Sequence, residues 1–337
     1  MDLGLAIAIA LAIGFAVTNG LHDASNAIAT LVATRAARPG QAIVLATIFN
    51  LIGPFVVGAA VADTIGGIVT VSPSETTEVI GCGLAAAVAW NMTTWWLGLP
   101  SSSGHALVGG LVGAAVVEGG IHAVNWGGIE SGKPVGVFGT LIALAISPVL
   151  GGLVAFLVIR ALRRLGRRLT HAWDGSVVAG QWAMSSALAF SHGANDAQKA
   201  VGVIAALLVG AGKVNSLSNT PTWVILACAV ALTMGTAFGG WRIIKTVGQR
   251  IYRLQSIEGL ASQTSSAGVI LGASLLGAPT STSQVVASSV VGIGGGRRRL
   301  RHVNWSLVRQ IGLAWLITMP VTALLAAATL AAWRWLT

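Results

Sequence analysis

The sequence predicts an all-α polytopic membrane protein with an inverted-topology repeat, two broken helices and two re-entrant helical hairpins. Three observations predict this fold class: few charged residues, long apolar runs and two pairs of similar polar motifs. Of the 337 residues, 54% are hydrophobic and 9% are charged, and the mean hydropathy is +0.79. Soluble domains carry about 25% charged residues. Composition therefore excludes a soluble enzyme, a disordered scaffold and a small secreted module held by disulfides.

Apolar runs long enough to cross a bilayer recur along the whole chain. A transmembrane helix needs about 20 predominantly apolar residues. Eight runs approach or exceed this length, at 3–34, 42–62, 79–99, 135–159, 176–211, 221–241, 257–277 and 304–333. Polar motifs interrupt the first and fifth runs, where we expect broken helices. Two shorter apolar pieces, 104–117 and 283–293, each follow a loop that begins with proline. The runs do not alternate apolar and polar residues as barrel strands do, so helices are expected throughout.

The positive charge of the chain indicates its orientation. The formal net charge is +10, from 20 Lys and Arg against 10 Asp and Glu. The basic residues concentrate in four clusters, at 35–38, 160–168, 242–253 and 297–301. Cytoplasmic loops of membrane proteins collect Lys and Arg. This rule places the four clusters in the cytoplasm and the N-terminus outside, so the charge requires no nucleic-acid partner.

Two motifs occur twice in the same order. Residues 20–27, Gly-Leu-His-Asp-Ala-Ser-Asn-Ala, align with residues 193–200, Gly-Ala-Asn-Asp-Ala-Gln-Lys-Ala. Residues 100–105, Pro-Ser-Ser-Ser-Gly-His, align with residues 279–284, Pro-Thr-Ser-Thr-Ser-Gln. The two offsets, 173 and 179 residues, are nearly equal. The chain therefore contains an internal repeat.

The charge-derived orientation makes the two repeats antiparallel across the membrane. The first half begins outside and the second begins inside, which is the architecture of many secondary transporters. We predict three regions: a first repeat at 1–159, a basic cytoplasmic linker at 160–175 and a second repeat at 176–337.

The two Pro-Ser/Thr loops predict a binding site for a small oxyanion. Proline at a helix start and Ser or Thr at its cap leave backbone N–H groups free at the positive end of the helix dipole. Such a helix end binds anions. Hairpins that enter from opposite faces bring their tips together near the membrane midplane. The expected donors are Ser101, Ser102, Ser103, Thr280, Ser281 and Thr282. One such loop alone would only cap its helix, but two symmetric copies favour a site.

Carboxylates within the apolar runs predict a site for the coupling cation. Asp23 and Asp196 are costly in a membrane unless they are paired or functional. Short polar residues with free backbone carbonyls suit a hard cation, and carboxylates suit proton relay. We therefore expect the cation at Asp23 with Asn26 and at Asp196 with Asn195. Lys199 aligns with Asn26, and either pairs with Asp196 or contacts the anion.

Four further ionisable residues accompany these motifs. His22, His105 and His192 flank them, and because imidazole ordinarily titrates near neutral pH they are candidates for proton relay. Glu258 opens the second hairpin at the cytoplasmic face, where it is either a gate or an ordinary interfacial charge. We expect no cofactor and no metal apart from a transported cation.

At these residues the chain resembles the PiT family of inorganic phosphate transporters, in particular the bacterial Pit-type, low-affinity permeases. The resemblance rests on residues 19–27, residues 191–199 and both Pro-Ser/Thr loops, and it spans nearly the whole chain. It implies a secondary transporter of the cell membrane, not an enzyme. Such a protein imports phosphate by alternating access, with protons, with sodium or as a neutral metal–phosphate complex.

The resemblance also implies where the ligands bind. Phosphate is expected at the two hairpin tips, with Asp23, Asp196 and Lys199 beside it, and the coupling cation at the Asp/Asn motifs. Three positions depart from the family pattern: Gln284 replaces a typical His, Asn50 replaces a carboxylate of some members, and His22 replaces the Asn of sodium-coupled relatives. Together with Lys199, His22 favours proton coupling.

Other functions remain open at the sequence level. A sulfate permease would share this architecture, although a hydrogen-bond acceptor such as Asp23 or Asp196 favours phosphate, which is partly protonated at neutral pH. An intramembrane hydrolase needs one Ser–His–Asp constellation, with no reason to duplicate it in inverted form. A channel would show uncoupled flux. The sequence does not determine the oligomeric state, and a homodimer in the lipid bilayer is compatible with it.

Overall fold

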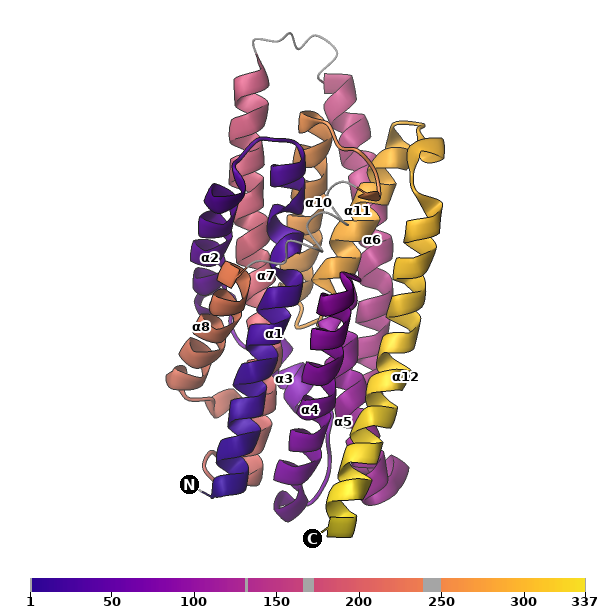
Figure 1. Cartoon of the computed structure of the whole chain (residues 1–337). Helices are drawn as coiled ribbons and strands as arrows, with labels where there is room; N and C mark the ends of the chain where they lie inside the picture. The colour runs from indigo at the N-terminus through magenta and orange to yellow at the C-terminus, as the bar shows by residue number, and fades with distance from the viewer. Residues whose placement is uncertain (1, 131–132, 166–172, 239–249, 337) are drawn as a thin grey trace.

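The chain forms a bundle of helices (Figure 1), seen in a computed structural model that describes residues 2–130, 133–165, 173–238 and 250–336. The first half contains α1 (Leu3–Ala33), α2 (Pro39–Val56), α3 (Ala60–Gly66), α4 (Pro73–Leu97), α5 (Ser103–Gly119) and α6 (Gly136–Leu165). The second half contains α7 (Asp174–Gly210), α8 (Thr222–Phe238), α10 (Ser256–Leu275), α11 (Thr282–Gly296) and α12 (Trp305–Leu336). Two short strands, β1 (Ile129–Glu130) and β2 (Lys133–Pro134), pair between α5 and α6.

The bundle has the surface of a multi-pass membrane protein. Five of its described helices are long and apolar enough to cross a bilayer. Large apolar side chains face outward on them, including Leu153, Leu316 and Leu324, which are 52%, 73% and 72% exposed. Both chain ends lie at one end of the bundle, and α6 ends and α7 begins at the other end (Figure 1). This arrangement agrees with the orientation expected from the charges.

Two helical hairpins form where the sequence predicts them. α4 and α5 make the first hairpin, and α10 and α11 make the second. In Figure 1 the first enters from the end that holds the termini and the second from the opposite end, so their loops meet near the middle of the bundle. α4 ends at Gly98, whose φ of +68° is the left-handed conformation that glycine adopts without strain. This turn allows the chain to reverse within a few residues.

The two expected helix breaks are absent, and this part of the predicted fold is wrong. α1 and α7 run without interruption through the Asp motifs. The polar side chains there bond to other side chains, some on the same helix and some on the hairpins, while the backbone keeps its helical hydrogen bonds. The motif glycines allow close packing of helices instead. A Cβ on Gly20 would lie 2.1 Å from Leu232 O of α8, and one on Gly193 would lie 2.3 Å from Asn50 O of α2.

Small residues also bring the outer helices against the hairpins. α12 packs on α5, and α6 packs on α11. A Cβ on Gly113 would lie 2.1 Å from Ala323 O, and one on Gly292 would lie 2.0 Å from Gly152 O. Such contacts let two backbones approach closely, as small residues do in membrane bundles. The hairpins are thereby held between long helices.

We expect Gly113→Ala to lower the stability of the protein, because the new methyl group meets the backbone of α12. Overpacking of this kind costs about 1–3 kcal/mol. The matched control is Gly312→Ala on α12, where no heavy atom lies within 4 Å of the new Cβ. Thermal unfolding in detergent, followed by size-exclusion chromatography, measures both. Equal Tm values for the two variants would contradict the packing described.

Candidate functional site

The helices α5 and α11 begin at the two hairpin tips with the same cap. Ser102 Oγ accepts a hydrogen bond from His105 N at 3.3 Å, and Ser281 Oγ accepts one from Gln284 N at 3.4 Å. One side-chain cap satisfies one of the unpaired N–H groups at a helix start, so others remain as donors. All six Ser and Thr residues of the predicted anion site are buried at these tips.

Asp23 of α1 connects the two hairpins. Its Oδ2 accepts a hydrogen bond from Ser103 Oγ of α5 at 3.0 Å, and its Oδ1 accepts one from Ser283 Oγ of α11. Asn26 Nδ2 also donates to Oδ1, at 2.7 Å. A single carboxylate that is 2% exposed therefore holds the first turns of two helices that enter from opposite ends.

Asp196 of α7 makes the corresponding contacts in the second half. Its Oδ2 accepts from Thr282 Oγ1 at 3.0 Å and lies 2.9 Å from His192 Nε2. Its Oδ1 accepts from Lys199 Nζ. Lys199 Nζ also donates to Thr280 O at 2.7 Å. Of the two roles considered for Lys199, the structure shows the pairing with Asp196.

Lys199 nevertheless lies between the two tips. A Cβ built on Gly104, in the first turn of α5, would lie 3.6 Å from Lys199 Nζ, while Thr280 belongs to the tip of the other hairpin. Asn26 and Lys199 occupy equivalent positions, each donating to the carboxylate three residues before it. The two halves thus differ by one positive charge at the same place.

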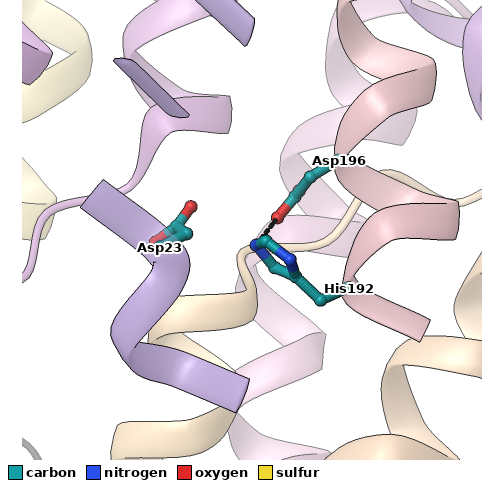
Figure 2. A group of neighbouring side chains, drawn as sticks. All are labelled: Asp23, His192 and Asp196. Atoms are coloured by element: carbon teal, nitrogen blue, oxygen red, sulfur yellow. Dashed lines mark ion pairs between the residues drawn. The ribbon is translucent and has the colours of Figure 1, made fainter. Parts of the chain in front are cut away.

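Two carboxylates and an imidazole converge at the centre of the bundle. Figure 2 shows Asp23 facing Asp196 and His192, whose side chains come from a different helix. One ligand atom of each of the three lies within 4.8 Å of the others, and all three residues are buried. Asn195 does not join this group. It donates to Ser274 Oγ at 3.0 Å and accepts from Thr280 N at 3.2 Å, so it holds the second hairpin.

The three predicted histidines all contact the site. His22 Nε2 lies 3.3 Å from Ser101 Oγ, and its Nδ1 lies 3.5 Å from Asp23 Oδ1. His105 Nδ1 lies 2.7 Å from Ser102 Oγ. His192 lies beside Asp196, and its other ring nitrogen, Nδ1, contacts Asn50 of α2. Each hydrogen-bonded imidazole lies beside a predicted ligand.

Several contacts were not anticipated from the sequence. Ser283 has no hydroxyl counterpart in the first loop, where Gly104 aligns with it. Asn19 Oδ1 lies 2.7 Å from Ser103 Oγ, and Asn19 is four residues before Asp23, on the same face of α1. Asn50 Oδ1 lies 3.0 Å from His192 Nδ1. The helical spacing of Asn19 was a usable signal, and nothing local identified Ser283. Asn50 was noted as a departure from the family pattern, but not as a partner of His192.

Glu258 lies at the base of the second hairpin, away from the tips. Its Oε1 is 2.7 Å from Arg297 Nε, and its Oε2 accepts from Gln255 N at 2.8 Å. Arg297 also donates to Gln255 Oε1 at 3.2 Å. This ion pair joins the start of α10 to the end of α11.

We expect Lys199→Met to destabilise the protein strongly, because it leaves the buried Asp196 without its charged partner. Removing one member of a buried ion pair costs about 3–5 kcal/mol. The double variant Lys199→Met/Asp196→Asn removes both charges and should recover most of the lost Tm in a detergent melt. A double variant as unstable as the single one would show that the pairing is not the cause.

Comparisons with known proteins identify the family of the chain. The model of the phosphate transporter family, PHO4, matches residues 19–178 and 176–326. The chain is 40% identical over 320 residues to a probable low-affinity inorganic phosphate transporter of Rhizobium meliloti (strain 1021), covering 95% of this chain and 93% of the relative. It is 36% identical over 332 residues to the protein so named in Bacillus subtilis (strain 168), covering 97% of each.

A solved structure described as the sodium-dependent phosphate transporter superposes with a TM-score of 0.86 at 27% identity, covering 99% of this chain and 100% of that one. The family match and the relatives confirm the predicted fold class, in the sense of a helical multi-pass membrane protein. They are transporters and not enzymes. This chain therefore belongs to the phosphate transporter family, and phosphate is the substrate that it carries across the membrane.

Proposed function

We propose that the protein imports phosphate by symport with a cation, by alternating access around the site between the hairpin tips. The observation that carries this proposal is the bonding of one buried carboxylate, Asp23, to the first turns of both α5 and α11. It supports a single site reached from two opposite directions. The protein then belongs in the cell membrane, with the basic linker in the cytoplasm.

Phosphate binds in this proposal between the starts of α5 and α11. Free N–H groups and hydroxyls at the two helix starts supply donors, and Lys199 supplies positive charge between the tips. Asp23 and Asp196 accept hydrogen bonds from a protonated phosphate oxygen. Sulfate carries no such proton at neutral pH, so the same carboxylates repel it. The two carboxylates therefore favour phosphate over other tetrahedral oxyanions.

The proton is the favoured coupling ion. Hard cations bind oxygen ligands. Around Asp196, however, nitrogen atoms of Lys199 and His192 occupy the positions that such a cation would need. The carboxylate, imidazole and hydroxyl groups found there suit the transfer of a proton.

Sodium is the second candidate, and one feature of the first half favours it. Oxygen atoms of Ser103 and Ser283 contact the carboxylate of Asp23, and Asn19 Oδ1 contacts the same Ser103 hydroxyl. The protein of the superposed structure is itself described as sodium-dependent. A cation at Asp23 would lie beside the bound anion and offset its charge.

The inverted repeat provides the two alternating states. Ser103 donates to Asp23 and Thr282 donates to Asp196, and these four residues are equivalent under the two sequence offsets. Equivalent contacts support the division into 1–159, 160–175 and 176–337. Exchange of the two hairpin conformations would open the site to one side and then to the other. The Glu258–Arg297 pair acts as the cytoplasmic gate, since it closes the base of the second hairpin.

Uptake into proteoliposomes under separately imposed gradients tests the coupling ion. We expect labelled phosphate to accumulate when the proton gradient is inward and sodium is absent, because the carboxylate, imidazole and hydroxyl groups around Asp196 suit proton transfer. Accumulation that is driven only by sodium would overturn proton coupling. Uptake that ignores both gradients would indicate a channel, and full competition by equimolar sulfate would overturn the preference for phosphate.

Serine substitutions at the two tips test the site itself. We expect Ser102→Ala and Ser281→Ala each to raise the Kd for phosphate about tenfold, as loss of a hydrogen bond to a charged group does. The matched control is Ser265→Ala, since that buried hydroxyl donates within α10 to Ser262 O. Equilibrium binding of labelled phosphate to purified protein measures the effect. Unchanged affinity in both tip variants would show that phosphate does not bind at the hairpin tips.

A further inference from the structure

A cavity lies beside the central site, between α3, α6 and α10. Its volume is about 760 Å³. Residues of α10 that lack side chains leave much of this space open. No heavy atom lies within 4 Å of a Cβ built on Gly268 or on Gly272. The cavity therefore exists because glycines stand where larger residues would fill it.

One end of the cavity lies at the start of α6. Asn125 and Gly136, which flank the short β1–β2 hairpin, line this end together with Asp63 of α3. Asp63 is the only residue with an ionisable side chain among the described residues that line the cavity. Within the described parts of the chain, no salt bridge includes it. Its carboxylate thus provides the only negative charge among the described residues that line the cavity.

The other end of the cavity reaches the tip of the second hairpin. Pro279 and Thr280 line it there. Thr280 is 1% exposed, and its Oγ1 has no hydrogen-bond partner among the described residues. A buried unpaired hydroxyl is costly unless water or an ion satisfies it. The backbone oxygen of the same residue accepts from Lys199, the partner of Asp196.

We propose that this cavity is the route by which the coupling cation reaches the central site from outside, and that Asp63 selects positive charge at its mouth. The inference rests on the proposed cation symport. Low-dielectric walls focus the field of a charge in a cleft and raise the local concentration of counter-ions. The remaining lining is uncharged and largely aliphatic, so Asp63 dominates the potential. The same carboxylate repels phosphate, which assigns this route to the cation.

Cysteine labelling tests the charge selectivity of the route without measuring transport. Gly272→Cys is introduced into a chain in which Cys82 and Cys228 are replaced by alanine, and intact cells are treated with membrane-impermeant methanethiosulfonates. We expect the reagent carrying an ammonium group to react about tenfold faster than the one carrying a sulfonate, relative to a small thiol in solution. Asp63→Asn should abolish this preference.

The matched control is Gly312→Cys on α12, which has equally open surroundings and does not line the cavity. Because Gly312 lies near the cytoplasmic start of α12, impermeant reagents should not label this cysteine from outside, with or without Asp63→Asn. The inference is overturned if the preference at Gly272→Cys persists in Asp63→Asn, or if that cysteine reacts only from the cytoplasmic side. It also fails if only a lipid-soluble maleimide reaches the cysteine, because the cavity would then be filled by lipid.

Filling the cavity tests its role in transport. Gly272→Leu should reduce phosphate uptake at least about fivefold while the Kd for phosphate in detergent stays unchanged, because the side chain blocks a route away from the anion site. Gly312→Leu should transport normally. Wild-type uptake by Gly272→Leu would overturn the inference. Labelling does not depend on coupling, so a failure of the gradient experiment and a failure of this inference remain separate results.

Discussion

The fold depends on the burial of one carboxylate at the centre of the bundle. Asp23 is 2% exposed, and a charge so far from water requires hydrogen-bond donors from every side. Ser103 and Ser283 supply them from two hairpins that enter from opposite ends, and Asn26 supplies a third from its own helix. The two helix starts must therefore meet where this carboxylate lies. The proposed anion site therefore lies next to a carboxylate.

A difference of one charge separates two otherwise equivalent halves. In the first half the neutral Asn26 bonds to Asp23, and in the second half the cationic Lys199 bonds to Asp196. The position that Lys199 takes beside Asp196 is thus taken by a neutral amide beside Asp23, next to the proposed phosphate site. A transported proton or cation near Asp23 would supply positive charge there, beside the bound anion. The equivalent contacts of the two repeats thus build the site. The difference between Asn26 and Lys199 supports the proposed coupling of two ions.

Glycine has two physical roles in this chain, and they are easily confused at the level of sequence. Gly20 and Gly193 stand inside the polar motifs where broken helices were expected. Both helices continue past these glycines, which allow the backbone of a neighbouring helix to approach closely. Gly272, in contrast, has no neighbour and leaves space beside α10. Close contact and open space both result from a missing side chain, and only the position of the next helix distinguishes them.

The sequence alone determined the features that depend on local properties. Apolar run length predicted the long helices, and the Pro-Ser/Thr pattern predicted the caps Ser102 and Ser281, because each signal lies within a single segment. The tertiary structure decided which polar groups meet. Ser283 bonds to a carboxylate 260 residues away, Asn195 holds a hairpin instead of joining Asp196, and Lys199 pairs with that carboxylate. Each of these side chains has several partners of suitable chemistry, and the choice among them follows from how the helices pack.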